Sequence, residues 1–224
     1  TQGIRLNHQS YTGSNVSPSL NLSQDLGGDF TLKMGIARAW KAPNLYQTNP
    51  NYLLYSSGNG CYDTGSSCYL QGNKNLKAET SINKEIGIEY HHERVQAGLT
   101  WYRNDYRNKI EAGTSSAYYN GTSNVYQWTN VPKSVVQGLE GTFNFPISDR
   151  VTMNNNFTYI IDNENKSTGD YLSIIPKFTI NSELDWQATN DLAVQGTMTW
   201  YGRQKPQKYN TQGVATSGSE TWQV

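Results

Sequence analysis

The stretch FTLKMGIARAW, from Phe30 to Trp40, alternates between two kinds of side chain. One set of alternate positions carries Phe30, Leu32, Met34, Ile36 and Trp40, and the other carries Thr31, Lys33, Gly35, Ala37 and Ala39. This period of two predicts a β-strand, because successive side chains of a strand point to opposite faces. Arg38 interrupts the apolar set near its end, which suits a strand that is leaving a lipid layer, where a long side chain reaches the headgroups.

Similar alternation recurs along the chain and predicts about nine strands. Clear patterns cover 95–102, 139–145, 151–161, 178–186 and 192–200, and weaker ones cover 3–8 and 16–25. The run from Ile82 to Tyr90 also fits, although Lys84 breaks its apolar face. Residues 221–224 begin a further strand, so we expect an incomplete arc of a larger wall.

The predicted connections alternate between short and long. Short turns fall at 26–29, 91–94, 146–149 and 188–191, and long polar loops at 42–78, 107–124, 162–170 and 202–220. The brief connection at 11–15 is the exception on the long side. In an up-and-down meander, this alternation puts all large loops on one side, as in outer-membrane barrels. A Greek-key sandwich has no reason to show it.

Composition excludes two classes of protein. No run of about 20 apolar residues exists to cross a bilayer as a helix. Lys plus Arg and Asp plus Glu both number 18, so there is no basic excess to hold nucleic acid. The hydrophobic fraction of 35%, with 16 Tyr and 6 Trp, suits a barrel wall that is wet on one face, but a soluble β-sandwich shares it.

The two cysteines, Cys61 and Cys68, flank turn-forming residues and predict a disulfide-closed loop in an oxidising compartment. Two free thiols are the alternative, which is disfavoured because an exposed thiol in a polar loop is open to oxidation. A metal site would need further soft ligands nearby.

The sequence predicts no enzyme and no metal site. No Ser/His/Asp set or carboxylate pair can be assembled from spacing. His91 and His92 are adjacent in a predicted turn at a strand end. Neighbouring side chains there point to opposite faces, so the two histidines are not expected to hold one metal ion.

Five stretches resemble TonB-dependent outer-membrane receptors, and within them the branch for ferric enterobactin and related catecholate siderophores. They cover 33–62, 69–90, 101–113, 172–187 and 199–210, so the resemblance extends over nearly the whole chain. Leu76–Thr80 with Glu85 and Gly87, and Asn130-Val131 with Gly138–Glu140, resemble patterns of these receptors in general.

The resemblance implies a transmembrane antiparallel barrel of about 22 strands, closed by an N-terminal plug. Residues 1–224 would be part of the barrel domain, and we expect the plug to lie outside them. The implied location is the bacterial outer membrane, with the large loops extracellular. The implied function is TonB-dependent uptake of a ferric catecholate siderophore, with iron as cargo and no resident cofactor.

The implied partners are the siderophore, outer-membrane lipid, and TonB acting through the plug; a colicin or phage could also use the loops. A passive porin or an adhesin would share the barrel and stays open as the rival reading.

A ferric catecholate is an anion with flat aromatic rings, so its receptor needs cationic and aromatic groups on the extracellular side. The 42–78 loop and its edge offer such groups, and we predict ligand contacts from Tyr52, Tyr55, Tyr62, Tyr69 and Lys41. The alternative is that these tyrosines only pack the loop or lie at the headgroup level. A second aromatic cluster is expected at Tyr118, Tyr119, Tyr126 and Trp128.

Overall fold

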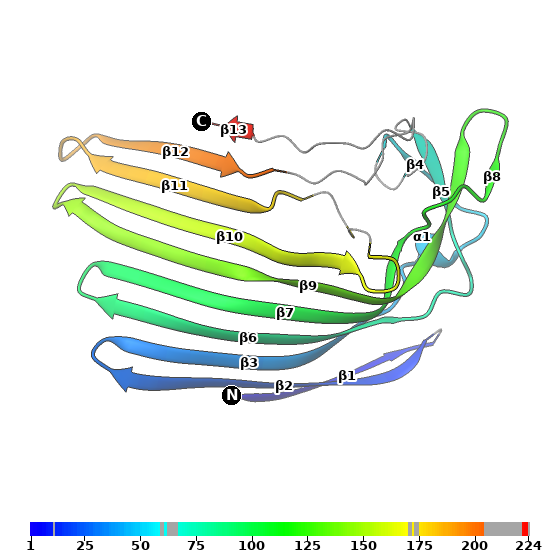
Figure 1. Ribbon diagram of the computed structural model, residues 1–224, viewed down its shortest axis with the longest axis horizontal. Helices are drawn as coiled ribbons and strands as arrows, with labels where there is room; N and C mark the ends of the chain where they lie inside the picture. Colours follow the sequence, from blue (N-terminus) through cyan, green and yellow to red (C-terminus); the bar gives the residue numbers. More distant parts are fainter. Residues whose placement is uncertain are drawn as a thin grey trace.

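The computed structural model describes residues 1–10, 12–58, 61, 67–169, 172, 175–203 and 221–223. Strands that follow one another along the chain lie side by side in an antiparallel sheet (Figure 1). They are β1 (Gln2–Gln9), β2 (Gly13–Gly27), β3 (Phe30–Lys41), β6 (Glu79–His92), β7 (Val95–Ala112), β9 (Asn124–Ser148), β10 (Val151–Asn165), β11 (Phe178–Gln187), β12 (Ala193–Tyr201) and β13 (Thr221–Gln223). This arrangement confirms the predicted meander.

The connections at the two ends of the strands differ, as the spacing along the sequence predicts. Tight turns at 28–29, 93–94 and 149–150 lie along one end, which we call the turn edge. At the other edge, the long connections carry α1 (Leu45–Thr48), β4 (Leu53–Ser56), β5 (Cys68–Gln71) and β8 (Tyr118–Tyr119) (Figure 1). We call this the loop edge. No helix among the described residues is long and apolar enough to cross a bilayer.

Several strands are longer than the sequence predicts. The expected loops at 107–124 and 162–170 are shorter, because β7 continues to Ala112 and β10 to Asn165. The expected loop at 42–78 contains the helix α1 and the strands β4 and β5. About 9 to 11 residues cross a bilayer, so the strands extend beyond it. There polar and charged side chains occur on both faces, and the alternation that reveals a strand is lost.

Cross-strand register collects the apolar residues on one face. Met34 faces Ile86, and Ile86 faces Trp101. Leu139 lies between Trp101 and Tyr159. Many of these side chains are exposed, as on β3, β6, β10 and β12. We call this the apolar belt.

The opposite face is polar. Lys33 Nζ lies 2.7 Å from Glu89 Oε1, and both side chains are about half exposed. Further along the sheet, Asn154 Nδ2 and Gln195 Nε2 each donate to Asp185 at 3.0 Å. A single sheet with one apolar and one hydrated face is what a barrel wall requires.

Candidate ligand-binding surface at the loop edge

The pair of strands β4 and β5 sorts its side chains between a buried and an exposed face. Leu54 faces Leu70 across the pair, on the side that packs inward. Tyr55 faces Tyr69 on the other side, with ring centroids 5.6 Å apart and edge-to-face. Because strand side chains alternate, burying Leu54 and Leu70 turns both tyrosines outward. Tyr55 is 58% exposed.

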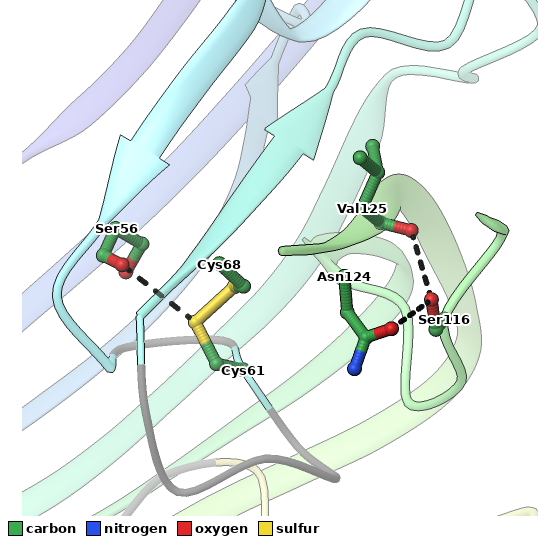
Figure 2. Close-up of a disulfide and its surroundings, with 6 residues drawn as sticks. All are labelled: Ser56, Cys61, Cys68, Ser116, Asn124 and Val125. Carbon is green, nitrogen blue, oxygen red and sulfur yellow. Dashed lines mark hydrogen bonds between the residues drawn. A yellow bond between two sulfur atoms is a disulfide. The ribbon is translucent and has the colours of Figure 1, made fainter. Parts of the chain in front are cut away.

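The disulfide closes the loop between these strands. Cys61 and Cys68 are bonded with an S–S distance of 2.04 Å and a Cα–Cα distance of 5.7 Å. Figure 2 shows the bond beside Ser56, whose carbonyl oxygen lies 3.9 Å from Cys61 Sγ. Both cysteines are buried, together with Leu70 and Tyr126. The predicted disulfide is confirmed, and it is part of the packed core of the loop edge.

The strand β9 holds this core in place. It pairs in parallel with β5, so that Leu70 lies opposite Tyr126. Two side-chain bonds add to this pairing: Asn73 Nδ2 donates to the Trp128 carbonyl oxygen at 2.9 Å, and Gln127 Nε2 donates to the Gly72 carbonyl oxygen at 3.4 Å. These contacts fix β5 and the residues directly after it to the barrel wall.

A second contact ties the 113–123 segment to the start of β9. Ser116 Oγ lies 3.3 Å from Asn124 Oδ1 and 3.4 Å from the Val125 carbonyl oxygen (Figure 2). Tyr118 pairs with Val125 in the short strand β8. Both long segments thus converge on the first residues of β9.

The second aromatic cluster divides into two groups. Tyr118 and Tyr119 are exposed, but Tyr126 is fully buried and Trp128 packs against the disulfide core. Tyr126 is therefore not accessible to a ligand in this structure. Its position in β9 directly faces β5, a long-range pairing that local sequence does not reveal.

Tyr52 lies beside an aromatic residue that we did not select from the sequence. Its ring centroid is 6.5 Å from that of Tyr46, which in turn is 6.1 Å from that of Trp128. Tyr46 belongs to α1, where Gln47 Oε1 accepts a bond from the Asn44 backbone N–H at 2.9 Å. An Asn three residues before a Gln is a helix-start signal that was available in the sequence.

The remaining candidates are Lys41 and Tyr62. Lys41 is the exposed last residue of β3 and lies opposite Glu79, on the polar face. Tyr62 is outside the described residues. The structure thus brings Tyr55 and Tyr69 together, places Tyr52 beside Tyr46, and places Lys41 at the end of the wall. Their contact with a ligand stays a prediction.

At the turn edge, His92 Nδ1 lies 2.7 Å from Asp29 Oδ2. Within the described parts of the chain, no three His, Cys, Asp or Glu side chains are grouped so that they could hold a metal ion.

A meander with a continuous apolar belt, a polar opposite face and large connections on one edge defines the wall of a transmembrane β-barrel. A family model described as "TonB dependent receptor-like, beta-barrel" matches residues 1–223. The chain therefore belongs to the TonB-dependent receptor β-barrel family, and its place is the bacterial outer membrane with the loop edge extracellular.

Individual relatives agree with this assignment. The chain is 60% identical over its whole length to the ferrienterobactin receptor of Escherichia coli and 56% identical to the ferric enterobactin receptor of Pseudomonas aeruginosa. It covers 30% and 31% of those two proteins, so it spans about a third of their length.

Solved structures show the same likeness. A crystal structure of a ferric enterobactin receptor mutant from Pseudomonas aeruginosa in complex with enterobactin is 55% identical, with a TM-score of 0.77. It covers 100% of this chain, which covers 33% of that protein. The siderophore receptor PirA of Acinetobacter baumannii is 40% identical with a TM-score of 0.76, over 99% of this chain and 36% of the other.

Proposed function

We propose that the intact protein is a receptor that imports a ferric catecholate siderophore of the enterobactin type. The observation that carries this proposal is the 60% identity to a ferrienterobactin receptor, which extends through the whole chain and so includes the loop edge. The residues described here would be part of the barrel domain. An N-terminal plug outside them would couple to TonB, and iron would travel as cargo.

The chemistry of the loop edge supports this proposal. A ferric catecholate presents flat rings, and Tyr52 and Tyr55 present exposed rings, with Tyr69 in edge contact with Tyr55. Such ring contacts contribute about 0.5 to 1.5 kcal/mol each. Lys41 would add positive charge for the anionic ligand. Tyr62 lies outside the described residues and is included in the proposed contact set only as a further aromatic residue of the 42–78 segment.

Uptake measurements test the function. Cells whose only route for ferric enterobactin is the full-length receptor are supplied with the radioactive iron complex, with and without TonB. We expect iron to enter only when TonB is present. Entry that persists without TonB would indicate a passive porin, and no entry in either case would contradict the receptor assignment.

Binding measurements on tyrosine variants test the site. In the full-length receptor, the triple variant Y52A/Y55A/Y69A should weaken binding of ferric enterobactin by roughly tenfold or more, given the ring-contact energies. The variant K41A should weaken it further, and more at low salt, because exposed charges are screened by ions. Y90A, at the turn edge, is the control and should bind normally. Unchanged affinity in the triple variant would remove these residues from the site.

A further inference from the structure

The outward face of the sheet, which carries the apolar belt, changes from mainly apolar to largely charged toward the loop edge. Trp101, Leu139 and Tyr159 lie side by side in one apolar row of β7, β9 and β10. Two positions further along β7 and β9 stand Arg103 and Gln137, which face each other. Beyond this row, the outward face of β3, β6, β7, β9 and β10 carries many charged side chains among apolar ones such as Trp40, Ile82 and Val135. We call this surface the charged strip. Its cations are Arg38, Lys84, Arg103, Arg107, Lys109, Lys133 and Lys166, and its carboxylates are Asp105, Glu111, Asp162 and Glu164.

The carboxylates of the charged strip already have partners. Asp105 accepts from Lys84 at 2.9 Å and from Arg103 at 2.8 Å. Lys109 is paired with Glu111 and Lys166 with Glu164, and Gln137 donates to Asp162. The excess of cations over carboxylates is therefore not cancelled within the strip.

Arg107 and Lys133 carry most of that excess, the remainder lying on Arg38, which donates to Asn15 and to the Val16 carbonyl oxygen. Arg107 and Lys133 occupy facing positions on β7 and β9, and both are exposed. Among the residues that the structure describes, neither makes an ion pair with a carboxylate. Like charges directly opposite each other on neighbouring strands destabilise a sheet. An anion held between the two side chains would remove this repulsion.

The position of the charged strip indicates which kind of anion would lie between Arg107 and Lys133. Arg103 to Arg107 covers about 13 Å of strand at 3.3 Å per residue. At the usual barrel tilt, this corresponds to a height of roughly 10 Å directly outside the apolar belt. Headgroups begin at this level. The side chains point away from the lumen, so a solute in the barrel does not meet them.

We propose that Arg107 and Lys133 bind the phosphate of a phosphorylated lipid headgroup in the outer leaflet, with Arg103 and Lys84 bordering the site. The ion pairs of Asp105 keep those two bordering cations in place. This lipid site is separate from the siderophore surface, since Tyr55 and Lys41 do not belong to the outward face of the strip. The proposed lipid site requires only that the sheet lies in the outer membrane, and not that the receptor binds a siderophore.

The test uses the purified full-length receptor in detergent, titrated with bisphosphorylated lipid A, with bound copies counted by native mass spectrometry. Removing both charges in R107A/K133A should weaken binding by roughly tenfold to thirtyfold, given the usual contribution of each basic residue near an anionic lipid surface. R107Q/K133Q, which keeps side-chain bulk, should show the same loss. R107K/K133R should retain binding, because the charges remain.

The control is R94A/R150A, which removes two cations from the tight turns at the opposite edge and should bind lipid A normally. Fully dephosphorylated lipid A should bind the wild-type receptor weakly. Unchanged binding in both charge-removing variants would overturn the proposal. So would equal binding of the dephosphorylated lipid, or an equal loss in the control.

Discussion

Gly72 lies where the 42–78 segment folds back on itself. A Cβ atom at this position would lie 1.9 Å from the Asn49 carbonyl oxygen, which belongs to the backbone and has little freedom to move. The Gly72 backbone N–H also donates to the Tyr52 carbonyl oxygen at 3.3 Å. The close approach therefore positions Tyr52, one of the proposed ligand contacts.

Substituting Gly72→Ala should open this part of the loop edge. Forcing a methyl group into a filled space typically costs about 1 to 3 kcal/mol. We expect faster amide hydrogen exchange in β4 and β5 and weaker ferric enterobactin binding, with the barrel strands unchanged. Gly196→Ala is the control, because a Cβ there meets nothing within 4 Å. Equal rates of amide hydrogen exchange in β4 and β5 in both variants would show that the backbone accommodates the added methyl group without destabilising the loop edge.

For individual residues, the sequence predicts local chemistry well and long-range packing poorly. Cys61 and Cys68 could be paired because they are close in sequence and lie in a polar loop. The burial of Tyr126 could not be predicted, since it depends on a parallel pairing with β5, more than fifty residues away. The exposure of Tyr55 also depends on which face of β4 packs inward.

The β4–β5 pair is the element that presents the candidate tyrosines, and the disulfide at its end limits its motion. On the chain-entropy model, a ring of this size contributes about 2 to 3 kcal/mol. The strands of the wall are held instead by long ladders, such as the one between β7 and β9. The stability of the β4–β5 pair and the stability of the barrel wall therefore depend on different interactions.

Replacing both cysteines in C61S/C68S should loosen β4 and β5 and leave the wall intact. Hydrogen exchange should accelerate at 53–56 and 68–71, while protection of β7 and β9 should not change. Siderophore affinity should fall because the tyrosines lose their fixed spacing. S57A/S67A, which changes one serine outside the ring and one within it but keeps the disulfide, is the control. A lower unfolding temperature of the whole barrel, with no faster exchange in β4 and β5, would show that the disulfide stabilises the wall and not the loop edge.

Strand identity was predictable in the apolar belt, where lipid demands an apolar residue at every second position. Outside the belt, polar and charged side chains occur on both faces, so the extension of β7 through Arg107 and Lys109 has no periodic signal. The positions of Arg38 and Lys84, which interrupt the alternation, mark the level at which their strands leave the belt.

The whole sheet separates lipid from water, and neighbouring residues on one strand experience opposite environments. Phe157 is in the apolar belt between Gly141 and Ile180, whereas Asn156 is on the polar face, where its Oδ1 accepts from Asn181 Nδ2 at 2.8 Å. An Arg on the lipid face near the bilayer midplane costs about 2 to 4 kcal/mol, and one on the lumen face costs much less.

Phe157→Arg should therefore lower the free energy of unfolding in lipid vesicles by about 2 to 4 kcal/mol. Asn156→Arg is the matched control on the other face and should cause a much smaller loss, measured by urea titration of the full-length receptor. Equal losses would contradict the assignment of the two faces.

We propose that this wall and its loop edge belong to a receptor that is selective for ferric catecholates. The most direct measurement is the equilibrium binding of ferric enterobactin and of a ferric hydroxamate to the purified full-length receptor, followed by quenching of intrinsic fluorescence. We expect saturable binding of the catecholate complex, which a large excess of the hydroxamate complex does not displace. Equal binding of both complexes, or binding of the hydroxamate alone, would contradict it.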